Sequence, residues 1–221
     1  ISFKFDSLLA SFSAEKFVND ILVNKLRIKN IVVGYDFKFG KDRQGNVDLL
    51  KKLSIKHKFT VLVIKKIFNQ EDSQPCSSSL IRHNINDGNF RKVSNLLGRN
   101  WSMKGKVVYG NKKARKMKFP TANILPKNLV EPKKGVYAVR VKFFDNYYEG
   151  IANFGLRPTI DGEKLLLEVH LFNFNENIYG KELTVEFLTF IREEKKFENF
   201  SLLTEQVQKD IQIVRNYHAK I

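Results

Sequence analysis

Six short segments with strand-like patterning fill the second half of the chain, and they restrict its fold more than any other feature. Short turn sequences such as Asp145-Asn146 and Asp161-Gly162 separate several of them. Closely spaced strands joined by tight turns favour an antiparallel barrel or sandwich over another layer of alternating helices and strands. The predicted strands, rich in β-branched and aromatic residues, are Gly105–Tyr109, Thr121–Leu125, Gly135–Phe143, Tyr147–Phe154, Leu165–Phe172 and Leu183–Ile191.

A helix is predicted after the last of these strands, from Phe200 to His218. Its apolar residues recur at helical spacing on one face: Leu203, Val207, Ile211 and Val214. An apolar stripe of this kind is stable only when it is covered. We therefore expect the helix to pack against the barrel and close it.

The first hundred residues alternate helix and strand signals. Apolar strands are predicted at Asn30–Gly34 and Thr60–Ile64, with a helix from about Val47 to His57 between them. This order is typical of a parallel α/β sheet, in which ligands bind beyond the carboxyl ends of the strands. The loop from Tyr35 to Asn46 is therefore a candidate binding segment.

A hydroxyl-rich sequence, Ser77-Ser78-Ser79-Leu80-Ile81-Arg82, resembles the start of a helix. Free backbone N–H groups, hydroxyls and a guanidinium would meet there, which suits a phosphate group. An ordinary N-cap explains the serines almost as well.

Composition limits the classes of partner. The 221 residues are 43% hydrophobic and 12% aromatic, which is enough for one large or two small cores. A net charge of +16 attracts anions, so nucleic acid, acidic membranes and phosphorylated small molecules all fit it. The basic residues are spread along the chain and not gathered into a tail, so we expect small-molecule substrates and no nucleic acid.

The cysteine and histidine content excludes two further kinds of site. Cys76 is the single cysteine, so no internal disulfide is possible, and four scattered histidines offer no zinc site. The sequence contains no apolar run of about 18 residues and no charged-then-apolar leader. We expect a protein of the cytoplasm, without a membrane partner, whose oligomeric state the sequence leaves open. Because the chain begins at Ile1, we also expect its natural beginning to be missing.

Phe119-Pro120-Thr121-Ala122-Asn123 is the strongest functional candidate. At strand spacing the hydroxyl of Thr121 and the carboxamide of Asn123 point to the same side. Neutral oxygen donors beside a glycine-containing basic segment, Gly105 to Lys118, suit a Mg²⁺ ion that carries nucleotide phosphates. The alternative is an edge strand begun by proline, with two ordinary polar residues.

Glu168 is the candidate for acid–base chemistry. Alternation in Leu165–Phe172 places it on one face with Leu166, His170 and Phe172. Beside a nucleotide site, such a carboxylate can accept the proton of an attacking hydroxyl. The alternative is that Glu168 and His170 face solvent or pair with lysines on the outside of the barrel.

Taken together, these motifs resemble the bacterial bifunctional riboflavin kinase/FAD synthetases almost from end to end. The matching segments, in chain order, are Val33–Asn46, Ser77–Arg82, Phe119–Asn123, Pro132–Tyr137 with Ala152–Thr159, Glu168–Phe172, and Phe190–Arg192 with Lys196–Phe197. The resemblance implies an α/β nucleotidyltransferase-like (Rossmann-like) partial domain over residues 1–98. It also implies a six-stranded antiparallel β-barrel riboflavin kinase domain with a C-terminal helix over residues 99–221.

For the kinase domain, the resemblance implies that ATP phosphorylates riboflavin to FMN. Thr121 and Asn123 would hold Mg²⁺ and the nucleotide phosphates, and Glu168 would be the general base. We also expect ligand contacts at Gly105, Lys118, Asn153 and Arg157.

For the first domain, the resemblance implies adenylylation of FMN to FAD by a second ATP. Asp36, Phe37 and Phe39 would belong to the flavin-binding loop. The phosphate signature would comprise Ser77, Ser78 and Arg82, with Ser79 standing where the family has threonine.

Three departures from the family pattern affect these expectations. The family's Gly-x-Phe-Asp-x-x-His-x-Gly-His segment does not occur in these 221 residues, so we expect them to form FMN but little or no FAD. Ala114 and Lys118 stand where the family has glycine, which alters how closely the backbone can approach a phosphate.

Two alternatives to catalysis stay open: a basic barrel that binds nucleic acid, and a catalytically silent flavin-binding relative.

Overall fold

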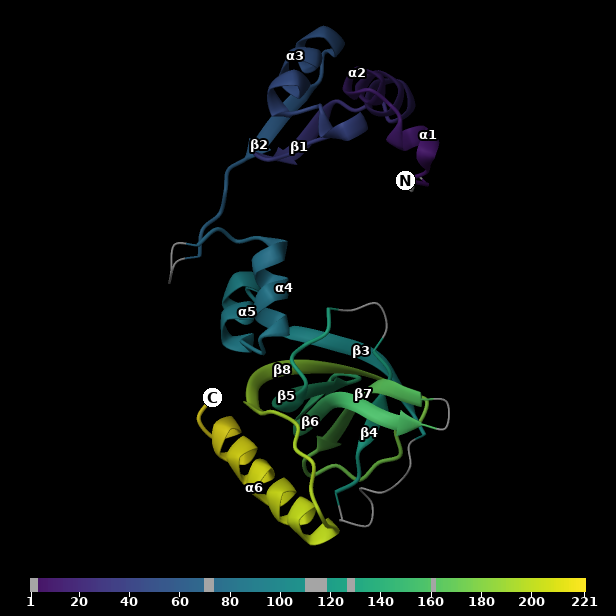
Figure 1. The fold of residues 1–221 in the computed structure, drawn as a ribbon. Coiled ribbons are helices and arrows are strands. Elements are labelled where there is room, and N and C mark those ends of the chain that lie inside the picture. Colours follow the sequence, from purple (N-terminus) through teal and green to yellow (C-terminus); the bar gives the residue numbers. More distant parts are fainter. Residues whose placement is uncertain (1–3, 70–73, 110–118, 127–129, 160–161) are drawn as a thin grey trace. The chain divides into compact units, whose positions relative to one another are not determined.

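The computed structural model describes residues 4–69, 74–109, 119–126, 130–159 and 162–221 (Figure 1). The chain divides into two compact units, Ile1–Pro75 and Cys76–Ile221. None of the helices within the described ranges combines the length and apolarity that crossing a membrane requires.

The first unit is a small α/β structure. Its helical segments are α1 (Ser7–Ala10), α2 (Ala14–Lys16), the π-helical η1 (Phe17–Lys25), the 3-10 turn η2 (Lys41–Arg43) and α3 (Val47–His57). Strands β1 (Asn30–Gly34) and β2 (Thr60–Ile64) pair in parallel, with Asn30 opposite Thr60 and Gly34 opposite Ile64. The predicted strands and helix are therefore confirmed.

Local sequence fixes the ends of α3. The Asn46 carboxamide oxygen accepts a hydrogen bond from the Leu49 N–H at 2.9 Å, which satisfies a free donor of the first turn. The helix stops at Lys58, whose left-handed backbone (φ 57°) ends the helical hydrogen bonding. Its inner face buries Leu50 and Leu53 in a core that Val18, Leu22, Val33, Phe39 and Phe59 complete.

In its described residues, the second unit is a closed barrel with three helices. Helices α4 (Ser78–Asn86) and α5 (Phe90–Leu97) precede strands β3 (Trp101–Val108), β4 (Ala122–Ile124), β5 (Gly135–Phe143), β6 (Asn146–Thr159), β7 (Gly162–Leu171) and β8 (Glu182–Arg192), and α6 (Phe200–His218) follows. Around the barrel the strands follow the order β3-β4-β7-β6-β5-β8, and all pairs are antiparallel. The six-stranded barrel and the final helix are confirmed.

The boundaries of several strands differ from the expectation: β3 begins at Trp101 and not at Gly105, and the largest difference is in the hairpin of β6 and β7. The predicted strand Tyr147–Phe154 continues to Thr159, and its partner begins at Gly162, because the two pair without interruption from Gly150 opposite Leu171 to Thr159 opposite Gly162. Gly155 and Pro158 resemble turn residues in the sequence, yet both lie within this long hairpin.

Helix α5 belongs to the core of the barrel unit. The Phe90 ring stacks on Phe187 at 5.1 Å between centroids and meets the edge of Tyr137 at 5.4 Å. Phe90 and Val93 are fully buried with the inward-facing residues of the strands. The compact unit thus begins at Cys76, whereas the expected division lies after residue 98. As an assignment of activities, the division into 1–98 and 99–221 stays a prediction.

Helix α6 lies along the outside of the barrel (Figure 1). Its Val214 is buried against Val136, Ala138, Ile151 and Phe172. The helix is also tied to the end of β8, where the guanidinium of Arg192 donates to both carboxylate oxygens of Asp210 at 2.6 to 3.0 Å. The apolar face predicted from the sequence therefore packs where expected.

Candidate functional site

Three polar side chains form a row across adjacent strands on the outer face of the barrel. Glu168 on β7 lies opposite Asn123 on β4 and opposite Asn153 on β6. Their neighbours Ala122, Val169 and Ala152 belong to the interior core, so the alternation of each strand turns the polar residues outward. The structure therefore brings together residues that are 15 to 45 positions apart in sequence.

The Asn123 and Asn153 side chains are shielded although they lie on the outer face. Asn123 is only 7% exposed. The Oδ1 atom of Asn153 is buried and meets no donor among the described residues. A buried acceptor without a partner costs free energy, so a ligand that donates a hydrogen bond there would be stabilised.

Glu168 is held by Arg157 from the far part of β6. The Nε and Nη2 atoms of Arg157 both lie 2.9 Å from Oε2 of Glu168. Its Nη1 donates to Glu194 Oε1 at 2.7 Å and to the Leu156 carbonyl at 2.8 Å. Glu168 therefore keeps Oε1 as the carboxylate oxygen that Arg157 does not engage.

Arg157 stays charged in this position. Burial by itself lowers the pKa of its guanidinium, but the charges and hydrogen bonds of Glu168 and Glu194 raise it more, so the net shift is upward. One guanidinium is thus shared by two carboxylates.

Thr121 precedes β4 and is half-buried. The preceding carbonyl, of Pro120, lies 2.8 Å from Nδ1 of His170 on β7. The Phe119 ring meets the His170 ring edge-on at 5.7 Å. These contacts fix the Phe-Pro-Thr-Ala-Asn segment beside β7, two residues from Glu168.

His170 makes a pH-dependent contribution to stability. Burial lowers its pKa below the ordinary value of 6.5. As pH falls through 6.5, the unfolded chain binds a proton that the folded chain resists, so folding stability decreases. We expect the urea midpoint to drop between about pH 7.5 and 5.5, and His170→Gln to drop less. Equal drops in both proteins would contradict this expectation.

Gly105 on β3 has a packing role. A Cβ atom at this position would lie 2.6 Å from Cγ2 of Ile124 on β4, which is fully buried. Glycine therefore permits the close approach of β3 and β4 that places Asn123. A nucleotide contact of Gly105 stays a prediction, and Ala114 and Lys118 lie outside the described residues.

The expected flavin loop of the first unit is ordered by its own aromatic residues. The rings of Phe37 and Phe39 stack at 5.3 Å, and Phe39 is buried in the core of the unit. Phe39 also pairs with Gly45, where a Cβ atom would meet the ring at 2.7 Å. Phe39 thus shapes the loop from inside, whereas Asp36 is exposed at its surface.

The expected phosphate signature begins helix α4. The Ser77 hydroxyl accepts a hydrogen bond from the Leu80 N–H at 3.1 Å and caps the helix. Arg82 reaches Ser78 Oγ at 3.4 Å from the next turn. The prediction of an N-cap is confirmed for Ser77, and the phosphate contact of Ser77, Ser78 and Arg82 stays a prediction.

The donor set on the barrel fits magnesium better than a transition metal. Within the described ranges, no three His, Cys, Asp or Glu side chains gather as a metal site. Thr121 and Asn123 supply neutral oxygens, and Mg²⁺ commonly takes few protein ligands when phosphates provide the others. The residues therefore fit a magnesium ion that arrives with a nucleotide.

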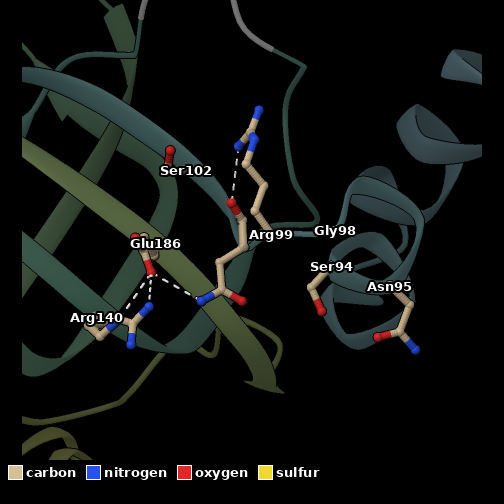
Figure 2. Close-up of a pocket in the computed structure, with 8 residues that line it drawn as sticks. Ser94, Asn95, Gly98, Arg99, Ser102, Arg140 and Glu186 are labelled. Carbon is tan, nitrogen blue, oxygen red and sulfur yellow. Dashed lines mark hydrogen bonds and ion pairs between the residues drawn. The ribbon is translucent and has the colours of Figure 1, made fainter.

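A second polar hollow lies elsewhere on the barrel unit (Figure 2). There Arg140 donates to Glu186 Oε2 at 2.7 and 3.0 Å, and Asn100 donates to the same atom at 3.0 Å. Its lining residues are Ser94, Asn95, Gly98, Arg99, Asn100, Ser102, Arg140 and Glu186, and no site residue expected from the sequence is among them. The half-buried Glu186 carboxylate is paired there with Arg140 and Asn100 through one oxygen, which indicates a structural ion pair.

Glu194 is the site residue that the sequence did not indicate. It follows β8 within a charged segment, Arg192 to Lys196, where every residue resembles an exposed polar one. Strand β5 pairs with both β6 and β8, and this pairing brings Glu194 to Arg157.

Comparison with known proteins gives consistent matches over both units. A family model described as riboflavin kinase matches residues 97–218, and one described as FAD synthetase matches residues 1–80. A bifunctional riboflavin kinase/FMN adenylyltransferase of Buchnera aphidicola (subsp. Schizaphis graminum) is 41% identical over 97% of this chain and 69% of that protein. The protein of the same description from Haemophilus influenzae is 42% identical over the same shares of the two chains.

A solved structure has the same fold. A crystal structure described as a macrolide-efflux protein from Streptococcus pneumoniae is 33% identical and superposes with a TM-score of 0.84. The match covers 96% of this chain and 68% of that chain.

Proposed function

The chain belongs to the bifunctional riboflavin kinase/FMN adenylyltransferase family, and on this premise we propose that Glu168 is the general base of its kinase reaction. The chain carries a riboflavin kinase domain and part of an FAD synthetase domain. A riboflavin kinase uses ATP and a flavin as substrates. The assignment of the base rests on one observation: Glu168 lies in register between two shielded carboxamides, with one oxygen held by Arg157.

Glu168 and Asn153 have different roles in the proposed reaction. The 5′-hydroxyl of riboflavin attacks the γ-phosphorus of ATP, the bond to the β,γ-bridging oxygen breaks, and ADP leaves. Glu168 accepts the hydroxyl proton through Oε1, the oxygen that Arg157 does not engage. The buried Oδ1 of Asn153 accepts a hydrogen bond from a hydroxyl of the flavin side chain and so orients it.

Thr121 and Asn123 would hold the magnesium ion of the nucleotide. Bound there, Mg²⁺ supplies neutralisation of the phosphate charges. The position of Asn123 opposite Glu168 and its low exposure support this assignment. The carboxamide and the carboxylate stand on neighbouring strands, so nucleotide phosphates and attacking hydroxyl would meet between them.

Replacing Asn123 by Ala tests the magnesium assignment. We expect kcat for FMN formation to fall by about tenfold to a hundredfold, because the phosphates lose a positioning ligand. The Mg²⁺ concentration needed for half-maximal rate should rise. Chromatography of the fluorescent flavins, after incubation with riboflavin, ATP and Mg²⁺, measures both quantities.

Asn95→Ala provides the matched control, since Asn95 is exposed on α5 and away from β4. Its rate and Mg²⁺ requirement should equal those of the unaltered chain. An Asn123→Ala protein with an unchanged Mg²⁺ requirement would show that Asn123 does not help to hold the ion.

A further inference from the structure

Arg157 lies between two carboxylates that come from different parts of the barrel. Its Nη1 is 2.7 Å from Glu194 Oε1, and its Nε and Nη2 are 2.9 Å from Glu168 Oε2. The three side chains are similarly shielded, with exposures of 27% for Arg157, 29% for Glu168 and 30% for Glu194. The guanidinium is therefore oriented by both carboxylates, together with the Leu156 carbonyl.

A glycine makes room for the Glu194 carboxylate. A Cβ atom added to Gly155 would lie 2.2 Å from one oxygen of Glu194 and 2.3 Å from the other. The backbone of Gly155 lies outside the left-handed region, so conformation alone does not require glycine there. Gly155 stands between Asn153 and Arg157 on the same face of β6, so Glu194 occupies the space directly above the site strand.

The segment that carries Glu194 is anchored by the two residues that precede it, Arg192 and Glu193. Arg192 is bound to Asp210 and also donates to the Glu193 carbonyl at 2.8 Å. The Glu193 carboxylate pairs with Lys133 at 2.8 Å, so it points to a different partner from its neighbour. Glu194 is thus directed to Arg157 by a fixed backbone.

Glu194 also changes the net charge around Glu168. Two carboxylates share one guanidinium, so Glu168, Arg157 and Glu194 together carry a net negative charge. Without Glu194, Arg157 would pair with Glu168 alone and would neutralise the carboxylate that has to accept a proton.

We propose that Glu194 is a positioning residue for phosphoryl transfer: it fixes Arg157 and shares its charge, and thereby holds Glu168 oriented and able to accept the hydroxyl proton. The proposal rests on the role of Glu168 proposed above. Glu194 itself does not touch the reacting atoms.

Two substitutions that weaken the same contact test it. Glu194→Gln removes the charge, and Gly155→Ala displaces the carboxylate without touching its chemistry. We expect each to lower kcat for FMN formation by about tenfold, with the KM values for riboflavin and ATP nearly unchanged. Because both act through one contact, the double variant should lose about tenfold and not the product of the two losses.

Glu193→Gln is the matched control, because it removes the neighbouring carboxylate, which pairs with Lys133. It should keep the kcat of the unaltered chain. A purely structural role would lower the unfolding midpoint of Glu194→Gln and leave kcat per folded molecule unchanged, which would overturn the proposal.

Comparison with the Glu168→Gln protein separates the positioning role of Glu194 from the role of Glu168 as the base. Full kcat in Glu194→Gln with an inactive Glu168→Gln protein would refute the positioning role alone. Full kcat in both would refute the assignment of Glu168 as the base, and the positioning role with it.

Discussion

Glu168→Gln is expected to lower kcat for FMN formation by about 10²-fold to 10⁴-fold, the range that a general base typically contributes. Glutamine keeps the size of the side chain and can still accept from Arg157, but it cannot take up the proton of the attacking hydroxyl. Riboflavin should still bind, and the change in flavin fluorescence on binding measures this. Flavin chromatography over a time course measures the rate.

Glu186→Gln is a control of the same chemical kind. Glu186 is also a shielded carboxylate on the barrel that pairs with an arginine, Arg140, at 2.7 Å. Loss of the Glu186 charge should weaken the ion pair with Arg140 and leave FMN formation unchanged. Equal losses of kcat in the two variants would mean that the rate depends on barrel ion pairs in general, and Glu168 would lose its special role.

Asp210→Ala is expected to produce the largest loss of folding stability, about 3 to 5 kcal/mol. Asp210 is 2% exposed and accepts from Arg192 and, at 2.8 Å, from Gln206. Without it the guanidinium of Arg192, which is only 17% exposed, has lost its counter-charge at the contact between β8 and α6. Urea unfolding followed by circular dichroism measures the change.

Glu205→Ala in the same helix is the comparison for this loss. Glu205 pairs with Lys209 at 2.6 Å, but both side chains are about three-fifths exposed. Solvent and salt screen exposed pairs, so the free energy of unfolding should change little. If Asp210→Ala lost no more than Glu205→Ala, the buried pair would not be what fastens α6.

The secondary structure followed from sequence wherever periodicity and end signals agreed. Helix α6 has its predicted bounds because Asn199 caps it and its apolar residues keep a helical spacing to His218. The hairpin of β6 and β7 was predicted too short, since Gly155 and Pro158 resemble turn residues when neighbours are unknown. The pairing of the whole hairpin decides that they remain in the strand.

The site was predictable in part, for a physical reason. Alternation placed Asn123 and Glu168 on faces of their own strands, but register between strands decides that they lie opposite each other. The contact of Arg157 with Glu194 spans 37 positions and depends on the pairing of β5 with both β6 and β8. No local pattern in the charged segment after β8 distinguishes Glu194 from Glu193.

The placement of α5 decides where this polypeptide can be cut. A shortened protein that began at residue 99 would include every strand of the barrel but would lack Phe90 and Val93, which are buried among Tyr137 and Phe187. The side chains of Tyr137 and Phe187 would then be exposed to water, and exposed apolar surface of this kind promotes aggregation. A start at Cys76 keeps both helices with the core that they cover, although it divides the chain within the region matched by the FAD synthetase family.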